Sequence, residues 1–438
     1  DPAVAYLAAS RYRLDEREPI LYRTRDYGAS WQLITNGIPD HDFTRVIRED
    51  PARKGLLYAG TETGIYVSFD EGDHWQSLQL NLPVVPIHDF VVKENDLIVA
   101  THGRSFWILD DLTPLHQLEE TTLTNEGLLF KPRAAYRPFP HLRPPKKALP
   151  GKNYQRISGG VVAFYEKENL RGERHRIYLD AGANPSEGMT FVYYLKNKPG
   201  KQAKLEIVDS RGNTVVSFAD APSQPIRVPA NVGMNRFVWD MRYSDAEGEA
   251  QGIAPVAVPG KYEIRFSAGG LVFKEEFEIL KDPRVAASQE DLRAQFDLMV
   301  KIREDLSACN QIVARTRSIR SQINRWIKRA QHNQSFKTLT SLANQIDQKL
   351  TKVEETTVSI PGSNPQKPPP TRLIGKLLSL SSVVASADWV PTNQSYEVFS
   401  LVSDKVEEQS LLLQTIVEDD IASFVKLIGN LGADALIN

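Results

Sequence analysis

The stretch that decides the fold is Ser68-Phe69-Asp70-Glu71-Gly72-Asp73-His74-Trp75, which has the form Ser/Thr-x-Asp-x-Gly-x-x-Trp. The chemistry of this pattern is local. A carboxylate such as that of Asp70 can accept backbone N–H groups across a tight turn, Gly72 supplies the backbone freedom that the turn needs, and Trp75 packs beneath it. The pattern is an Asp box, and it predicts a hairpin that is closed by its own side chains.

The same pattern occurs a second time, so the motif is part of a repeat. It begins 44 residues earlier, at Thr24, and carries Asp26, Gly28 and Trp31 at the defining positions. This spacing is typical of one four-stranded blade of a β-propeller. Short apolar runs of strand type, separated by turns rich in Gly, Asn and Asp, lie around both boxes. We therefore predict that residues 1–112 are the C-terminal blades of a β-propeller.

The predicted propeller is incomplete within this sequence. Residues 1–112 hold strand-like runs for roughly two and a half blades, whereas a closed propeller typically has four to eight. Isolated blades would expose edge strands and an apolar face. The sequence begins with Asp1 rather than Met. We therefore expect the remaining blades to lie in an N-terminal part of the same gene product or in a companion chain.

The composition of the 438-residue chain limits the classes of function. With 41% hydrophobic and 25% charged residues, the chain can bury the cores of several domains. The formal net charge of −2 argues against a general nucleic-acid-binding protein. The single cysteine, Cys309, excludes an internal disulfide, and no zinc-binding spacing or membrane-spanning apolar run occurs. We expect neither a metal nor a cofactor.

Two changes of pattern follow the predicted blades. Residues 113–155 are rich in Pro, Arg and Lys, which predicts an extended linker. Residues 156–281 alternate again in the manner of strands, with Gly-containing turns between them. This second pattern is typical of an immunoglobulin-like or fibronectin-like β-sandwich. Such a sandwich would serve as a structural spacer or as a carbohydrate-binding module.

The last part of the chain, residues 282–438, has the period of helices. Ser288, followed three residues later by Asp291, predicts a helix N-cap. Apolar residues then recur at spacings of three and four along two successive stretches. The pattern stops in a Pro-rich loop at residues 360–371 and resumes after Pro391. We therefore predict a C-terminal α-helical bundle of roughly three or four helices.

The polar residues that best suit a ligand site lie next to the predicted inner strands. His41-Asp42-Phe43 recurs as His88-Asp89-Phe90, each time close to an apolar run. A His–Asp pair can form structural hydrogen bonds, contact a ligand or cation, or orient an imidazole for acid–base catalysis. The repetition favours a structural role, because catalysis would require the group only once. His102 and Arg104 form a further cluster, in which the arginine could bind a carboxylate or form an ion pair between blades.

No catalytic residues can be assigned from the sequence. A nucleophile elbow, a phosphate-binding loop and a zinc-binding H-E-x-x-H helix are all absent. Carboxylate pairs such as Glu119-Glu120 are adjacent in sequence, which is typical of a solvated surface.

Further stretches around the repeat carry a resemblance to a protein family. Residues 55–61 precede the second Asp box and residues 100–111 follow it, and the likeness continues through residues 235–242, 258–262 and 282–284. With both boxes, these stretches make the chain similar to the C-terminal half of bacterial BNR-repeat proteins, which have sortilin-like β-propellers and are often labelled glycosyl hydrolases. The resemblance implies a bacterial, extracytoplasmic protein, either secreted or in the cell envelope, with two propellers at full length.

The resemblance implies two alternative functions. Sortilin-type relatives hold peptides inside the propeller, which requires no catalytic residues. Sialidases with Asp boxes use an arginine triad and a Tyr/Glu pair, and those positions cannot be assigned in this sequence. We therefore expect a non-catalytic scaffold that binds a protein or peptide through the propeller and docks through the sandwich or the helices. The alternative is a sialidase-like glycoside hydrolase whose catalytic residues lie largely in a missing N-terminal part. The expected partners also include a membrane-associated complex or a second copy of the chain, and exclude nucleic acid.

Overall fold

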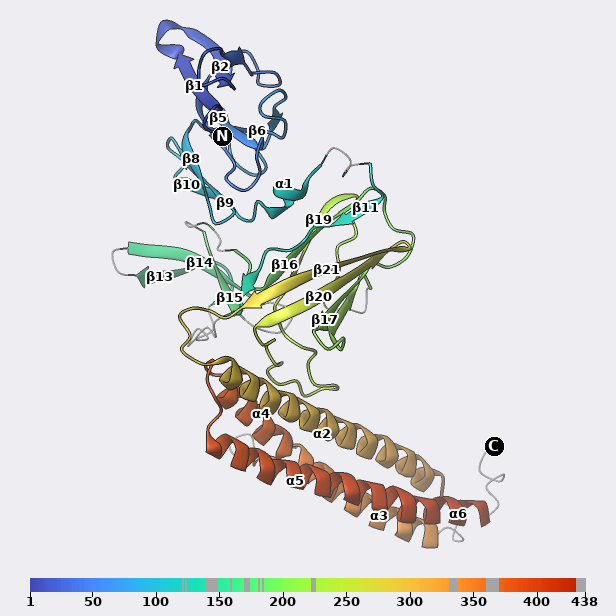
Figure 1. The fold of residues 1–438 in the computed structure, drawn as a ribbon. Helices are drawn as coiled ribbons and strands as arrows, with labels where there is room; N and C mark the ends of the chain where they lie inside the picture. Colours follow the sequence, from blue (N-terminus) through green and yellow to red (C-terminus); the bar gives the residue numbers. More distant parts are fainter. Residues whose placement is uncertain are drawn as a thin grey trace.

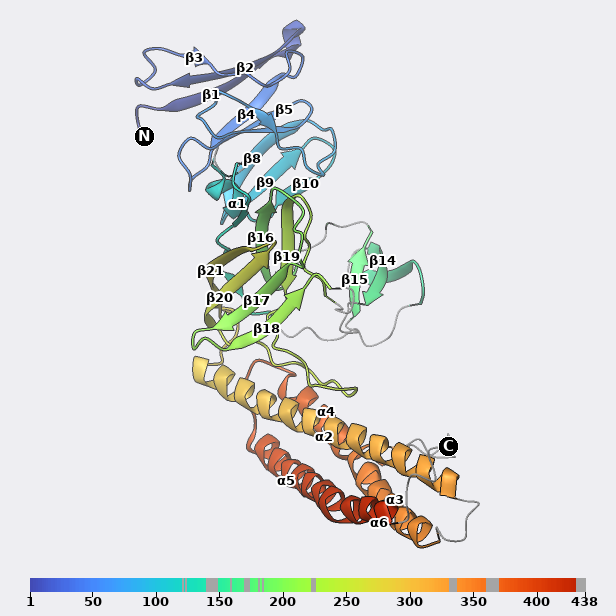
Figure 2. The same ribbon diagram turned by 90° about the vertical axis from the view of Figure 1, so that its right-hand side faces the viewer.

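The protein consists mostly of β-sheets followed by a helical C-terminal part (Figure 1). Three N-terminal sheets, a pair of facing sheets and the helices follow one another along one direction, so that the first strands and the last helix lie at opposite ends (Figures 1 and 2). The computed structural model describes residues 1–119, 122, 124–138, 149–157, 160–168, 174–179, 182, 185–221, 226–330, 337–359 and 370–430.

The N-terminal part is built from three antiparallel sheets in chain order. Their strands are β1 (Ala5–Arg11), β2 (Glu16–Thr24), β3 (Gln32–Leu33), β4 (Thr44–Glu49), β5 (Leu57–Thr61), β6 (Ile65–Ser68), β7 (Gln76–Ser77), β8 (Ile87–Lys93), β9 (Asp96–Thr101) and β10 (Phe106–Leu109), with a short 3-10 helix, η1 (Tyr12–Leu14), between β1 and β2. The strand orders are β1-β2-β3, β4-β5-β6-β7 and β8-β9-β10. Each sheet is therefore a meander, in which every strand pairs with the next one along the chain.

The second sheet lies between the other two, because β4 packs against both β1 and β8. One apolar cluster, which includes Leu21, Ile47 and Trp75, fills the space between the first and second sheets. Another, which includes Tyr58 and Phe90, fills the space between the second and third. Strand β5 is buried along its whole length, as its continuous apolar run predicts.

The middle part contains two facing sheets and one outlying sheet. Its strands are β11 (Gly127–Leu129), β12 (Ala135–Tyr136), β13 (Asn153–Ile157), β14 (Gly160–Glu168), β15 (Arg174–Tyr178), β16 (Met189–Leu195), β17 (Lys204–Asp209), β18 (Thr214–Ala219), β19 (Gly233–Trp239), β20 (Gly260–Ala268) and β21 (Leu271–Leu280). Sheet β11-β16-β19 faces sheet β12-β21-β20-β17-β18 across one core, which is rich in aromatic side chains such as Phe191, Tyr193, Trp239 and Phe266. Sheet β13-β14-β15 lies to one side of this pair (Figure 2).

The segment predicted as a linker contributes to the folded parts instead. Helix α1 (Thr113–Gln117) lies in it, β11 pairs with β16, and β12 pairs with β21 in parallel. Strand β13 crosses the predicted boundary at residue 155. An extended chain can join the edge of a sheet through its backbone alone, so composition does not reveal these additions. The most basic stretch of the predicted linker, residues 139–148, lies outside the described residues.

The C-terminal part is helical. It comprises α2 (Gln289–Ala330), α3 (Lys337–Thr357), α4 (Leu373–Val384), α5 (Asn393–Thr415), the π-helical turn η4 (Ile416–Ile421) and α6 (Ala422–Asn430), which share one apolar core that includes the buried Cys309. The N-cap predicted for the first helix is confirmed. The N–H of Asp291 donates to Ser288 Oγ at 3.1 Å, and the N–H of Ser288 donates to Asp291 Oδ2 at 2.9 Å. In the described part of the chain, no helix combines the length and the apolar character needed to cross a membrane. Most of the predicted Pro-rich loop lies outside the described residues.

A buried polar cluster joins the helices to the facing sheets. Arg137 is 4% exposed, and its Nη2 donates to Asp388 Oδ1 at 3.1 Å and to Gln295 Oε1 at 3.2 Å. Its Nη1 donates to the carbonyl of Ala257 at 3.2 Å, and Gln295 Nε2 donates to the carbonyl of Val384 at 2.8 Å. Burial lowers the pKa of Arg137 and raises the pKa of Asp388, while each partner's charge opposes the shift of the other. Contacts of this kind fix the orientation of the two parts.

Candidate functional site

The two Asp boxes form equivalent hairpins in consecutive sheets, since the first connects β2 to β3 and the second connects β6 to β7. In the first box, Asp26 Oδ1 accepts the N–H of Ser30 at 2.9 Å. In the second, Asp70 Oδ1 accepts the N–H of His74 at 2.9 Å. The carboxylates therefore close both turns by the same hydrogen bond.

The backbones of the two boxes also match. Gly28 and Gly72 have φ angles of +88° and +95°, and the residues before them, Tyr27 and Glu71, both have a φ of 60°. Glycine adopts this left-handed region at little cost. At Gly72, a Cβ atom would also approach Ile34 Cδ1 to 2.6 Å. Conformation therefore favours glycine in both boxes, and in the second box a larger residue would also displace the end of the Ile34 side chain.

Hydrogen bonding keeps both carboxylates ionised. Hydrogen bonds from the side chain and the N–H of Ser30 lower the pKa of Asp26 to about 2. Burial raises the pKa of Asp70, but hydrogen bonds from the N–H of His74 and from the hydroxyl of Ser68 outweigh it, so that this pKa is also lowered. At neutral pH both carboxylates are therefore ionised and can accept the hydrogen bonds that close their turns.

The second box also joins two sheets. Trp75 is 5% exposed, and its Nε1 donates at 2.7 Å to the carbonyl of Ile34, which directly follows β3. The N–H of Trp75 donates to the carbonyl of Asn36 at 2.8 Å. From β2, the buried guanidinium of Arg23 donates to the carbonyl of Glu71 at 2.7 Å. The second box is therefore a docking contact between the first and second sheets.

The first box has no such neighbour. Trp31, which occupies the position of Trp75, is 44% exposed. The nearby side chains of Tyr27 and Leu33 are 79% and 53% exposed. Within the described residues, no sheet covers this end of the first sheet. The two boxes thus share a geometry and differ in their surroundings.

The two His-Asp-Phe stretches do not occupy equivalent positions. Asp42 precedes β4, whereas His88 and Asp89 lie inside β8. In each of these strands the register of pairing with the next strand shifts directly after the first residue, at Arg45 in β4 and at His88 in β8. The structural counterpart of His88 is therefore Arg45. The recurrence of His-Asp-Phe in the sequence therefore does not mark one place in the repeat, because the first stretch ends before its strand begins and the second lies inside its strand.

Asp42 holds a turn together. It is 1% exposed, and its Oδ2 accepts the hydroxyl groups of Thr61, Thr63 and Tyr66 at 2.8, 2.7 and 3.2 Å. Its Oδ1 accepts the N–H of Thr63 at 3.1 Å. Burial, followed by the charge of Asp42, raises the pKa of Tyr66 to about 12. Asp42 therefore closes the turn between β5 and β6, and only the exposed His41 of this stretch faces solvent.

Three other predicted ligand-binding residues lie on β8 and directly after β9. The rings of His88 and His102 stack with their centroids 4.8 Å apart. Asp89 Oδ1 forms an ion pair with Arg48 Nη2 of β4 at 2.8 Å. Arg104 is exposed in the turn between β9 and β10, where its carbonyl accepts Trp107 Nε1 at 2.9 Å. The structure thus brings three of the predicted residues to adjacent strands and leaves His41 and Arg104 apart.

Three further residues of these strands and their turns, Arg45, Arg48 and Glu62, were not predicted from the sequence. Arg45 forms an ion pair with Glu62, and its guanidinium lies over the rings of Tyr12 and Phe43. An irregularity in a strand changes the direction of a side chain, and no local pattern signals it here. We call the three pairs Arg45–Glu62, Arg48–Asp89 and His88–His102 together the β4–β8 surface.

A buried Asp–His–Tyr set was also not expected. Asp50 Oδ2 accepts the hydroxyl of Tyr58 at 2.9 Å and lies 2.9 Å from His116 Nε2. Burial raises the pKa of Asp50, but hydrogen bonds from His116, the N–H of Ala52 and Tyr58 outweigh it and lower this pKa. The side chain of Asp50 is 0% exposed and that of His116 is 14% exposed. A substrate cannot reach the carboxylate, so this set anchors α1 to the second sheet. Among the described residues, no group of three or more His, Cys, Asp and Glu side chains could hold a metal ion.

The chain has only partial likenesses among known proteins. No protein-family model and no curated protein matches it. It is similar to YCF48 bound to D1 peptide, with 23% identity over 21% of this chain and 31% of that one and a TM-score of 0.18. It is similar to AFV00434, an ancestral GH74 enzyme, with 14% identity over 50% of this chain and 37% of that one and a TM-score of 0.20. It is also similar to the extracellular domain of BT4673 from B. thetaiotaomicron, with 12% identity over 60% of this chain and 29% of that one and a TM-score of 0.18. The chain spans between 29% and 37% of the length of these proteins, and such TM-scores assign neither a fold nor an activity.

Proposed function

We propose that residues 1–112 are consecutive blades of a β-propeller completed by further sheets, and that the protein is a non-catalytic, extracytoplasmic scaffold that binds a protein or peptide. The observation that carries this proposal is the repeated Asp-box hairpin, whose second copy docks onto the preceding sheet through Trp75. The extracytoplasmic location rests on the family resemblance. In the same proposal, the two facing sheets of the middle part are an immunoglobulin-like spacer between the propeller and the helices.

The outer faces of the three N-terminal sheets support a larger ring. On one side Trp31 and Leu33 are exposed, and on the other Phe106 and Ile108 of β10 are 74% and 57% exposed. Large apolar side chains on the outer faces of a sheet stack favour association with another sheet. A preceding sheet that presented a carbonyl in the manner of Ile34 would accept the indole N–H of Trp31.

The β4–β8 surface suits the backbone and charged side chains of a peptide. Guanidinium groups donate to carboxylates and carbonyls, and imidazoles can donate or accept. Arg48 and Asp89 are 50% and 61% exposed. An ion pair between exposed groups is worth little, so a ligand can replace it at small cost. In a closed propeller these strands would face the central tunnel, where ligands commonly bind.

Selection from a displayed random-peptide library tests the binding function, with the longest natural form of the protein as bait. We expect enrichment of a peptide family by the wild type and its loss in the double variant Arg48→Gln, His88→Ala. The variant Lys352→Gln, which changes an exposed residue of α3, should retain the enrichment. If no peptide family is enriched, or if the double variant enriches it equally, the proposal fails.

Glycoside hydrolysis is the alternative implied by the resemblance. The same protein incubated with a panel of glycans would release sugar if this alternative held. Loss of that activity on replacing carboxylates of the propeller interior would establish hydrolysis in place of peptide binding.

A further inference from the structure

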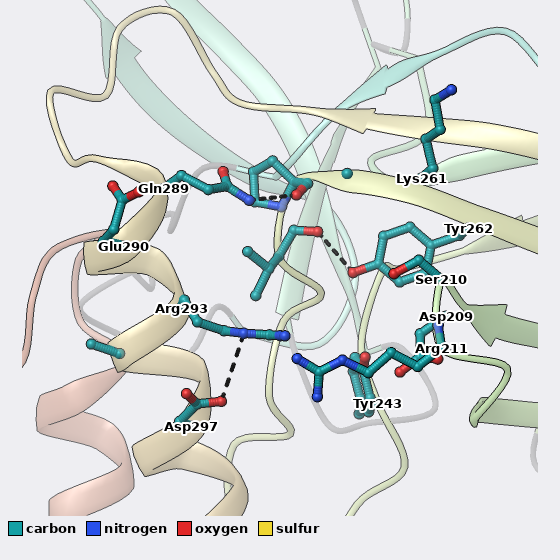
Figure 3. Close-up of a pocket in the computed structure, with 14 residues that line it drawn as sticks. Asp209, Ser210, Arg211, Tyr243, Lys261, Tyr262, Gln289, Glu290, Arg293 and Asp297 are labelled. Carbon is teal, nitrogen blue, oxygen red and sulfur yellow. Dashed lines mark hydrogen bonds and ion pairs between the residues drawn. The ribbon is translucent and has the colours of Figure 1, made fainter.

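A pocket of about 560 Å³ opens where α2 meets the facing sheets (Figure 3). The N-terminal sheets lie at the opposite end of the facing sheets (Figure 1). Its walls come from the turn between β17 and β18, from the start of β20 and from the first turns of α2. Charged and aromatic side chains line it, and none of them belongs to the β4–β8 surface.

Two guanidinium groups face each other across this pocket. Figure 3 shows Arg293, from α2, and Arg211, from the β17–β18 turn, reaching toward one another from opposite walls. The guanidinium of Arg293 also lies over the ring of Phe296, 5.7 Å from its centroid. A guanidinium over an aromatic ring can still donate its N–H groups to an anion at its edge. Two like charges in this arrangement repel each other unless an anion lies between them.

The acidic residues of the pocket balance these two positive charges only in part. Asp209 Oδ1 accepts two backbone N–H groups of its own turn, including that of Arg211, at 2.9 Å each. Asp297 Oδ1 forms an ion pair with Arg293 Nε at 4.0 Å, a separation that is too long for a hydrogen bond. The carboxylate of Glu290 points away from the two arginines in Figure 3. Within the described residues, neither guanidinium has a hydrogen-bonded carboxylate.

The remaining walls are held in place before any ligand binds. Tyr262 is 8% exposed, and its hydroxyl donates to the carbonyl of Val258 at 2.8 Å. Tyr243 packs edge-on against Phe296 with the centroids 4.7 Å apart. Burial raises the pKa values of both tyrosines, so their hydroxyls stay protonated at neutral pH. A site with fixed walls loses little entropy on binding.

We propose that this pocket binds the oxyanion group of a small molecule, a carboxylate or a phosphate, between the guanidiniums of Arg211 and Arg293. The planar donors of arginine match both groups with paired hydrogen bonds. One arginine belongs to the facing sheets and the other to α2, so the bound anion would bridge these two parts of the protein.

Isothermal titration of the whole chain at low ionic strength tests the site, with malonate as the carboxylate probe and inorganic phosphate as the phosphate probe. We expect saturable binding of one anion per chain, and the preferred probe identifies the oxyanion class. Arg211→Gln and Arg293→Gln should each weaken binding at least tenfold, whereas Arg293→Lys should restore part of it. The control is Arg325→Gln, an exposed position on the same helix roughly 48 Å away at 1.5 Å per residue.

The proposal is overturned if neither probe binds saturably, or if Arg325→Gln weakens binding as much as the pocket variants. If a pocket variant does not fold, the wild type provides a second measurement. The Nε–Hε resonances of Arg211 and Arg293 should shift on adding the bound probe, and unchanged resonances would also overturn the proposal. Neither measurement depends on the peptide-binding function.

Discussion

Asp26 closes its hairpin with hydrogen bonds that favour the ionised carboxylate. Ser30 donates its N–H at 2.9 Å and its hydroxyl at 2.6 Å, and Thr24 adds a hydroxyl at 2.8 Å. These bonds lower the pKa of Asp26 from 3.8 to about 2. A carboxyl group with a lowered folded-state pKa stabilises the protein above its unfolded-state pKa, and this stabilisation is lost as the pH falls toward the folded-state value.

We therefore predict a pH-dependent effect of Asp26→Asn. The variant should have a lower Tm than the wild type at pH 7, and the difference should shrink as the pH falls from about 4 to about 2. Thermal unfolding followed by circular dichroism across this range measures it. Asp40→Asn, at an exposed position, should leave the Tm unchanged throughout. A Tm difference for Asp26→Asn that is equal at all pH values would contradict this account.

The residues of the Asp boxes could be predicted from the sequence because their hydrogen bonds span only a few positions. The partner of Trp75 could not, because the carbonyl of Ile34 lies 41 residues away and belongs to another sheet. The same holds for Asp42, for which a structural role was favoured over ligand contact, but whose partners Thr61, Thr63 and Tyr66 could not be named. The spacing of residues within a motif indicates which hydrogen bonds a side chain can form inside that motif. Its partners on other strands depend on how the strands pair.

Among the helices, α2 and α3 are joined by an ionic network that is centred on one buried glutamate. Glu354 is 5% exposed and accepts Arg317 Nε and Arg320 Nη1, each at 2.7 Å. Arg320 Nε also donates to Asp347 at 2.9 Å. Removing the central carboxylate would leave Arg320 with Asp347 alone and Arg317 with Glu249, whose Oε2 lies 3.5 Å from Arg317 Nη1.

We predict that Glu354→Ala lowers the free energy of unfolding of the helical part by about 1.5–3 kcal/mol, because charge-assisted hydrogen bonds to a buried carboxylate are lost while both arginines keep contact with solvent. Glu355→Ala, at the next and exposed position, should change it by less than about 0.5 kcal/mol. Urea unfolding followed by far-ultraviolet circular dichroism measures both variants. Equal effects of the two substitutions would show that the network does not stabilise the helix pair.

Helices in which apolar residues recur regularly over many positions could be predicted from the sequence. Shorter or less regular elements could not. The helical spacing of the apolar residues in α2 and α3 can be recognised in the sequence, because charged residues occupy the outer faces of both helices. In α4 the outer face carries mainly serines and further apolar residues, so its period is hidden and this helix was not expected. Strands of two residues, such as β12, are too short for any period and form only because β21 offers an edge.

At the scale of the whole molecule, the helices and the facing sheets depend on a contact between residues far apart in sequence. Arg137 and Asp388 are 251 positions apart, and their side chains are 4% and 7% exposed. No local pattern could indicate this pair. The segment that carries Arg137 was predicted as a linker, yet it places this side chain between the two parts.

We predict that Asp388→Ala loosens the contact between the helices and the facing sheets, since it leaves a buried guanidinium without its carboxylate, at a cost of about 3–5 kcal/mol. Amide hydrogen exchange near residues 384–392 and at the start of α2 should increase. Asp404→Ala, an exposed position of α5, should leave the exchange unchanged. Unaltered exchange in Asp388→Ala would mean that other contacts hold the parts together.

The central claim is that the first Asp box, like the second, is a docking contact for a preceding sheet. Hydroxyl-radical footprinting of Trp31 and Trp75, in this 438-residue chain and in the longest natural form of the protein, tests it most directly. The account predicts that Trp31 is oxidised much faster than Trp75 in the 438-residue chain and is protected to the level of Trp75 in the longer form. Equal oxidation of Trp31 in both forms, or oxidation of Trp75 as fast as that of Trp31 in the 438-residue chain, would contradict it.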